Sequence, residues 1–101
     1  MKVGIIGFGS IGTEVARALI NGIENFTLKG IVSRSKENAK RRILLLKHEI
    51  NIYDLDYIIK ESDIIIDCAP KEAFRNIAIR CIKSQKPLIT VSGAGILDNL
   101  D

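Results

Sequence analysis

Three glycines near the start of the chain, Gly7, Gly9 and Gly12, constrain what this sequence can fold into. They follow the apolar run Lys2–Ile6, which is typical of a strand, and they precede apolar residues at helical spacing from Ile11 onward. A glycine inside regular structure costs about 0.5–1 kcal/mol relative to alanine, so this spacing indicates a turn that requires missing side chains. The segment therefore predicts a strand, a tight glycine turn and a helix.

The rest of the chain repeats this alternation of strands and helices. Ser35 and Asp54 each precede a helical pattern and are expected N-caps, and Pro70 suits the first turn of another helix. The apolar run from Asp63 to Asp67 is typical of a central parallel strand that helices cover on both faces. We expect the later strands at Leu28–Val32, Ile50–Tyr53, Asp63–Asp67 and Leu88–Val91.

Five strands with intervening helices predict an α/β fold, a Rossmann-type doubly wound parallel sheet with strand order 3-2-1-4-5. With 101 residues, 47% of them hydrophobic, the chain has the size and composition of a single domain, which we place at residues 1–101. Such sheets bind ligands beyond the carboxyl ends of their strands, where the strand order reverses. That point lies between the first and fourth strands and brings together the loops at residues 7–12, 33–35 and 68–70.

The glycine spacing GxGxxG between a strand and a helix predicts a dinucleotide-binding loop. Gly7 would permit the tight turn, Gly9 would let the backbone approach a pyrophosphate, and Gly12 would let the helix pack close to the sheet. The free amides of the first helical turn would face the phosphates. A glycine turn that serves packing alone is the alternative. The candidate cofactor-binding residues of this loop are Gly7, Phe8, Gly9, Ser10, Ile11 and Gly12.

The second strand ends without the acidic residue that commonly binds the ribose hydroxyls of NAD. Ser33, Arg34 and Ser35 occupy this position, and we include them among the cofactor-binding candidates. A carboxylate would repel the 2′-phosphate of NADP, whereas a guanidinium would attract it. We therefore expect the cofactor to be NADP or NAD, with NADP mildly favoured, unless Arg34 is an ordinary surface arginine.

Charge and cysteine usage exclude several other classes of protein. The net charge of +3 comes from Lys and Arg residues that are interleaved with acids, and the densest basic stretch, Lys36–Arg42, is expected to be the solvated face of a helix, so we expect no nucleic-acid binding. Cys68 and Cys81 have no metal-ligand spacing with His48, so we expect no metal site and a reducing compartment.

No apolar run is long enough to cross a membrane and no secretory signal is visible, so we expect a cytoplasmic protein.

Several segments together resemble the N-terminal half of the L-aspartate dehydrogenase family: VGIIGFGSIG, IVSRS, the stretch from Asp63 to Ser92, and the Gly-Ala pair that follows it. In that family, as in the related homoserine dehydrogenases and dihydrodipicolinate reductases, the fourth strand ends in a turn of the type seen here in Asp67-Cys68-Ala69-Pro70. The resemblance implies that Cys68, Ala69 and Pro70 line the nicotinamide side of a cofactor cleft. It also implies the NAD(P)-binding domain of an oxidoreductase that converts aspartate to iminosuccinate.

Members of that family continue into a second α+β domain with the substrate site and a catalytic histidine, for which residues 1–101 offer no counterpart. His48 does not match that histidine, and we interpret Asp67 as structural in preference to catalytic, so no catalytic residue is expected here. We expect a chain that is inactive without a substrate domain or a partner chain. A stand-alone nucleotide-binding sensor is the alternative. The oligomeric state stays open, a homo-oligomer included.

Overall fold

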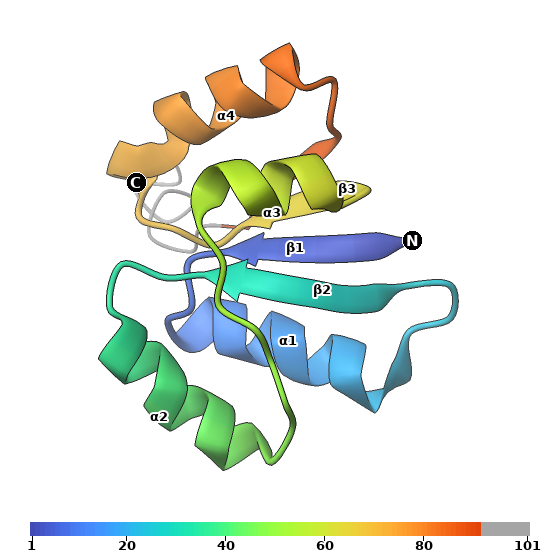
Figure 1. The fold of residues 1–101 in the computed structure, drawn as a ribbon, viewed down its shortest axis with the longest axis vertical. Coiled ribbons are helices and arrows are strands. Elements are labelled where there is room, and N and C mark those ends of the chain that lie inside the picture. The colour runs from blue at the N-terminus through green and yellow to red at the C-terminus, as the bar shows by residue number, and fades with distance from the viewer. Residues whose placement is uncertain (92–101) are drawn as a thin grey trace, which may run out of the picture.

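A four-stranded parallel sheet forms the centre of the protein, with its strands in the order β2-β1-β3-β4 (Figure 1). The computed structural model describes residues 1–91. The strands are β1 (Lys2–Ile6), β2 (Thr27–Val32), β3 (Ile64–Asp67) and β4 (Leu88–Thr90), and each neighbouring pair is parallel. The predicted Rossmann-type α/β sheet is confirmed, and its order reverses between β1 and β3, the strand expected as the fourth.

Helices cover both faces of this sheet: α1 and α2 lie on one face, and α3 and α4 lie on the other (Figure 1). Side chains alternate along a strand, so Ile5 of β1 belongs to the apolar cluster beneath α1 while Ile6 belongs to the cluster beneath α3. The sheet is therefore buried on both sides, as the apolar run in β3 predicts. The helices are α1 (Ser10–Gly22), α2 (Lys36–Leu46), α3 (Leu55–Glu61), the short 3-10 helix η1 (Lys71–Ala73) and α4 (Phe74–Lys83).

The strand expected at Ile50–Tyr53 is reduced to a single bridge between Ile52 and Ile31 of β2. The Ile31 amide donates to the Asn51 carbonyl at 3.0 Å, and the Tyr53 amide donates to the Ile31 carbonyl at 2.8 Å. Pairing cannot continue beyond Tyr53, because the next residue, Asp54, already caps α3. The segment still lies beside β2, where a third strand of the expected order would be, but the sheet in residues 1–91 has four strands.

Both predicted N-caps are confirmed by their hydrogen bonds. The Ser35 hydroxyl accepts from the Asn38 amide at 3.2 Å at the start of α2, and the Asp54 carboxylate accepts from the Tyr57 amide at 2.8 Å at the start of α3. The other end of α3 is satisfied from a distant part of the chain. The Lys86 ammonium donates to the carbonyls of Lys60 at 3.2 Å and Ser62 at 2.7 Å. This cation at a helix C-terminus joins α3 to the loop that precedes β4.

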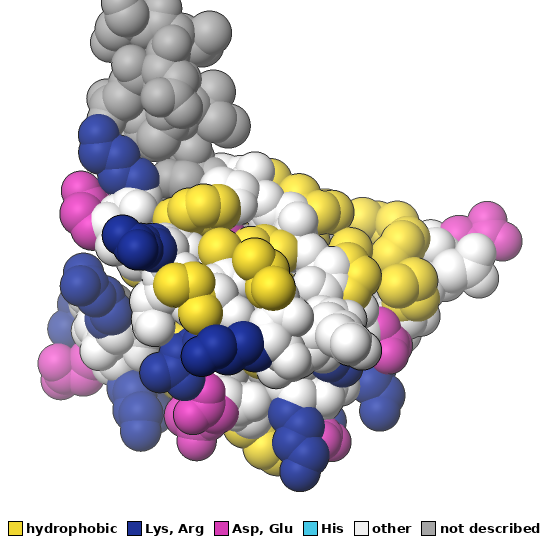
Figure 2. All heavy atoms as spheres, turned by 90° about the horizontal axis from the view of Figure 1, so that it is seen from above, with side chains coloured by type: hydrophobic (Ala, Val, Ile, Leu, Met, Phe, Trp, Pro, Cys, Tyr) yellow, Lys and Arg dark blue, Asp and Glu magenta, His cyan; other side chains and the backbone are white. Residues whose placement is uncertain are grey.

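Hydrophobic side chains reach the outer surface on the α4 side of the molecule, which is the face seen in Figure 2. Phe74 and Ile79 of α4 are each 42% exposed, Ile82 is 74% exposed, and Ile89 of β4 is 47% exposed. Within residues 1–91, no helix combines the length and the apolar character needed to cross a bilayer.

Candidate functional site

Two backbone hydrogen bonds bring three loops together at the carboxyl ends of the strands. The Gly7 amide, just after β1, donates to the Val32 carbonyl at the end of β2 at 2.8 Å. The Cys68 amide, just after β3, donates to the Ile6 carbonyl at the end of β1 at 2.7 Å. Because β1 lies between β2 and β3, the loops that follow these strands meet where the strand order reverses, as the topology predicts.

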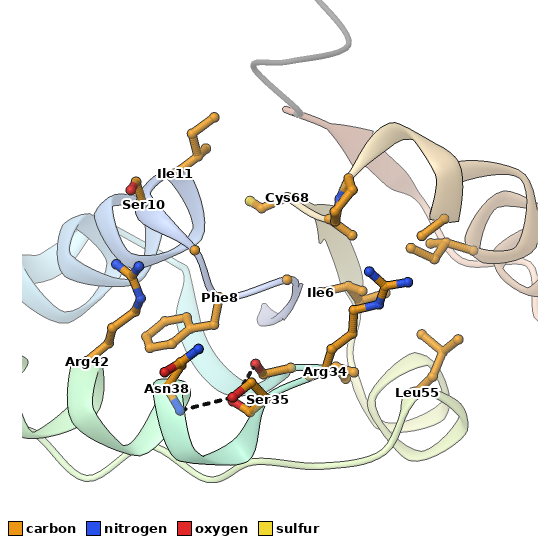
Figure 3. A pocket seen from close by; sticks show the side chains of 18 of the residues that line it. Ile6, Phe8, Ser10, Ile11, Arg34, Ser35, Asn38, Arg42, Leu55 and Cys68 are labelled. Atoms are coloured by element: carbon orange, nitrogen blue, oxygen red, sulfur yellow. Dashed lines mark hydrogen bonds between the residues drawn. The ribbon is translucent and has the colours of Figure 1, made fainter.

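A cavity of about 770 Å³ opens between these loops (Figure 3). That volume lies within the usual range for small-molecule and cofactor sites, roughly 300–1,000 Å³. The sequence-predicted residues that line it are Gly7, Phe8, Gly9, Ser10, Ile11, Ser33, Arg34, Ser35, Cys68, Ala69 and Pro70. Gly12 is the one predicted residue that does not line it, because it is buried behind the glycine turn.

The three glycines of the turn occupy different environments. Gly7 has a positive φ of 92°, and a Cβ atom there would lie 2.6 Å from the backbone nitrogen of Ala69. A Cβ atom on Gly12 would lie 2.1 Å from the Gly7 carbonyl oxygen. At Gly9, by contrast, a Cβ atom would meet no atom of residues 1–91 within 4 Å. Conformation or packing thus accounts for Gly7 and Gly12, whereas the space in front of Gly9 is open.

The start of α1 presents backbone amides to this open space. Gly9 is the N-cap residue of α1, and it has no side chain to bond the free amides. The first helical hydrogen bond runs from the Thr13 amide to the Gly9 carbonyl at 2.9 Å. The Thr13 hydroxyl donates to the same carbonyl at 2.6 Å and fixes the turn. Within residues 1–91, the amides of Ser10, Ile11 and Gly12 form no hydrogen bond. Such a helix end attracts anions through its free amides and its partial positive charge.

Among residues 1–91, the charged side chains around the cavity are all positive. No Asp or Glu of this range lines it, whereas Arg34 follows β2 and Arg42 belongs to α2. Neither arginine forms a salt bridge within the described part of the chain. Near them, the Ser33 hydroxyl donates to the Ser35 carbonyl at 3.0 Å. The charge and the free amides together favour an anionic ligand.

The lining also includes residues that the sequence analysis missed. In the stretch Lys36–Arg42, expected as a solvated helix face, Asn38 is exposed and Arg42 is half-buried, and both also line the cavity. Their spacing of four residues on one helix was the signal that could have revealed this shared face. The remaining additions are mostly apolar and come from the ends of β1 and β2 and from α3, η1 and α4. The lining residues missed from the sequence are Ile6, Val32, Asn38, Arg42, Leu55, Ala73, Asn76 and Ile77.

Asp67 lies at the end of β3 but does not line the cavity, and only 1% of it is exposed. Its Oδ1 accepts from the Ala69 amide at 2.9 Å, while its Oδ2 is buried and has no partner among the described residues. Burial raises the pKa of Asp67, against the lowering effect of the Ala69 hydrogen bond. Burial and then the Asp67 charge raise the pKa of the neighbouring Cys68 thiol to about 11. The hydrogen bond to Ala69 fits the structural role that we expect for Asp67.

Two further expectations concern residues away from the cavity. His48 is exposed and does not line it. Within residues 1–91 no group of three or more His, Cys, Asp and Glu side chains is placed to hold a metal ion. The Gly93-Ala94 pair used in the family resemblance lies outside the described residues.

Comparison with known proteins gives a consistent set of relatives. Residues 7–101 match the family model described as homoserine dehydrogenase, NAD binding domain. The chain is 34% identical over 101 residues to an L-aspartate dehydrogenase of Bradyrhizobium diazoefficiens, a match that covers all of this chain and 36% of that protein. It is 28% identical over 97 residues to an L-aspartate dehydrogenase of Methanocella arvoryzae, covering 96% of this chain and 36% of that protein. The chain therefore spans 36% of the length of these relatives.

Two solved structures with a similar fold are described as dehydrogenases. A probable dehydrogenase from Thermotoga maritima superposes with a TM-score of 0.77 at 24% identity, covering 89% of this chain and 27% of that chain. The myo-inositol dehydrogenase of Lactobacillus casei, solved in complex with NAD(H) and myo-inositol, superposes with a TM-score of 0.78 at 18% identity and the same coverage. At these identities the likeness concerns the fold.

Proposed function

This chain belongs to the family of homoserine dehydrogenase NAD-binding domains, and from that premise we propose that its cavity binds the adenosine and pyrophosphate of a nicotinamide dinucleotide. The observation that carries the proposal is the open space in front of Gly9. The free amides of Ser10 and Ile11 border this space, and no carboxylate of residues 1–91 lines the cavity. A pyrophosphate needs such a combination of backbone access, amide donors and positive potential.

The other predicted residues take their proposed roles from their places around the cavity. Ser33, Arg34 and Ser35 follow β2 and would contact the adenosine ribose, while Cys68, Ala69 and Pro70 follow β3 and would line the nicotinamide side. The nicotinamide ring supplies hydride transfer when it is bound. The protein's part is to hold the dinucleotide in one orientation across the ends of the strands.

We further propose that the domain serves an L-aspartate dehydrogenase that converts aspartate to iminosuccinate. The L-aspartate dehydrogenases among its relatives support this. Among residues 1–91, no His, Lys, Asp, Glu or Tyr side chain lines the cavity, so the proton transfer and the binding of substrate carboxylates need groups from outside this part of the chain. A further domain or a partner chain would supply them.

The cofactor preference is proposed from the end of β2, where a serine and an arginine stand in place of a carboxylate. Without a carboxylate, repulsion of a 2′-phosphate is absent, and Arg34 adds attraction. We expect NADP to bind about tenfold more tightly than NAD, which corresponds to about 1.4 kcal/mol, with NAD still bound. A cytoplasmic location and a homo-oligomeric state stay predictions from the sequence.

Calorimetric titration of residues 1–101 with NAD⁺ and NADP⁺ tests the proposed function. Gly9→Val would place a branched side chain where the pyrophosphate is expected, without meeting protein atoms at its Cβ. Affinity for both dinucleotides should fall at least tenfold, or by about 1.4 kcal/mol. Ala18→Val, on the exposed side of the same helix, is the matched control and should bind like the parent. Absence of binding by the parent, or unchanged affinity in folded Gly9→Val, would contradict the proposal.

A further inference from the structure

Arg42 is a half-buried cation on α2 that the glycine motif does not explain. It lies one helical turn after Asn38, and both residues line the cavity. Arg42 has no salt bridge within residues 1–91. Arg34, the cation expected from the sequence, is more exposed. The cavity therefore has a second arginine that is better shielded from solvent than the first.

The two arginines extend into different parts of the cavity. Figure 3 shows Arg42 extending from α2 toward Ser10 at the start of α1, while Arg34 extends the other way, toward Leu55. The ring of Phe8 lies beside Arg42 and Asn38 in the same view. Arg42 thus belongs to a polar part of the cavity between α1 and α2, which Arg34 does not reach in this conformation.

The groups in this polar part are predominantly hydrogen-bond donors. The Arg42 guanidinium and the side-chain NH₂ of Asn38 both donate. The Ser35 hydroxyl oxygen accepts from the backbone amide of Asn38, so the hydroxyl proton stays available for a ligand. The oxygens of an ionised phosphate act only as hydrogen-bond acceptors. Guanidinium, hydroxyl and amide donors therefore suit them. Since α2 begins directly after the end of β2, these donors lie on the side where the adenosine ribose is expected.

We propose that Arg42, with Asn38 and Ser35, forms the subsite for a phosphate monoester on the adenosine ribose, the 2′-phosphate of NADP. This inference rests on the proposed function and adds its specificity-determining residue. In this assignment Arg42 holds the 2′-phosphate, and the exposed Arg34 contributes a weaker attraction from the other side of the adenosine. The pyrophosphate stays with the amides at the start of α1, which Arg42 does not replace.

The test compares Arg42→Ala with Arg41→Ala, because Arg41 is the preceding residue on α2, is exposed and does not line the cavity. Calorimetric Kd values are measured for NADP⁺, NAD⁺, adenosine 2′-phosphate and adenosine 5′-phosphate. Arg42→Ala should weaken NADP⁺ and adenosine 2′-phosphate about tenfold and change NAD⁺ and adenosine 5′-phosphate less than twofold. Arg41→Ala should leave all four values unchanged. Arg42→Gln, which keeps the aliphatic part of the side chain, repeats the test if the alanine variant unfolds.

The outcomes separate this inference from the proposed function. If the parent binds neither NAD⁺ nor NADP⁺, the proposed function fails and the subsite fails with it. If the parent binds both dinucleotides and Arg42→Ala weakens them equally, Arg42 contacts the pyrophosphate and only the subsite assignment is overturned. If Arg42→Ala matches Arg41→Ala, Arg42 contacts no phosphate. A selective loss of the two ligands with a 2′-phosphate supports the assignment.

Discussion

The Gly7 carbonyl oxygen lies 2.1 Å from the position that a Cβ atom on Gly12 would occupy, so strand β1 and helix α1 approach too closely for a side chain there. We expect Gly12→Ser to lower the free energy of unfolding by about 1–3 kcal/mol, the usual cost of overpacking. The same substitution at Gly9 meets open space and introduces a favoured N-cap residue, so stability should change by less than about 0.5 kcal/mol. Urea unfolding of both variants checks the pair. Equal stabilities would mean that the turn relaxes around Gly12.

Arg34 should govern the part of the NADP preference that depends on salt. Its side chain is exposed, and exposed ion pairs contribute about 0.2–1 kcal/mol that salt weakens. Arg34→Ala should therefore reduce the ratio of the NAD⁺ and NADP⁺ dissociation constants about two- to fivefold at low salt and less at high salt. Titrations at two salt concentrations provide the measurement. A ratio that Arg34→Ala leaves untouched at low salt would place this side chain in solvent.

Residues 1–101 alone should not oxidise L-aspartate with either dinucleotide. No side chain of residues 1–91 that exchanges protons near neutral pH lines the cavity, and such groups commonly contribute about 100- to 10,000-fold to a rate. The assay follows reduced cofactor by its absorbance, with Asp67→Asn and His48→Ala tested beside the parent. Turnover that either substitution abolishes would show that the catalytic group lies within this chain.

Cys68 should react slowly with alkylating reagents, because burial and the Asp67 charge raise its pKa from 9.0 to about 11. A shift of two pKa units corresponds to about 100-fold less thiolate at pH 8, so iodoacetamide should modify Cys68 about 100-fold more slowly in the folded chain than in urea. Peptide mass spectrometry distinguishes it from Cys81. Asp67→Asn removes the charge and should raise the rate. A reaction midpoint near pH 9 in the folded parent would contradict the expectation.

Asp67 should make the chain less stable as pH rises. Burial raises its folded-state pKa above the ordinary value of 3.8, so between these two pKa values the folded chain binds more protons than the unfolded chain. Unfolding free energy therefore falls as pH rises from 3.8 to the folded-state pKa and then levels off. Asp67→Asn keeps an oxygen for the Ala69 amide and cannot ionise, so the variant should gain stability over the parent across that interval. If the difference in unfolding free energy between parent and variant does not change with pH, the pKa of Asp67 is not raised in the folded chain.

Sequence patterns anticipated the parts of this fold that depend on local chemistry. Ser35 and Asp54 begin helices because their side chains accept amides three residues ahead, a bond that needs nothing from the rest of the chain. The glycine turn is similar, since Gly7 requires a positive φ wherever the strand turns sharply. The adjacency of the three loops then follows from the crossover rules of parallel sheets.

Features that depend on tertiary geometry could not be predicted in the same way. The segment Ile50–Tyr53 has the composition of a strand, but the start of α3 at Asp54 limits its pairing to one bridge. Arg42 lies in a charged stretch typical of a solvated helix face, and it lines the cavity because α2 packs beside the loops that follow the strands. In both cases a neighbouring element decides the role of the residues. The local sequence carries no sign of that element.

The single bridge at Ile31 has a dynamic consequence for the wall that α2 forms. The segment that returns from α2 to α3 is tied to β2 through two hydrogen bonds, both to Ile31, whereas β1 is paired along its length on both sides. Local opening should therefore release this segment while the sheet stays intact, and the amide of Tyr53 should exchange with deuterium faster than that of Ile5. Because this segment continues directly from α2, whose Asn38 and Arg42 line the cavity, its opening should loosen that side of the cavity and favour entry of a long dinucleotide across the rim instead of end-on.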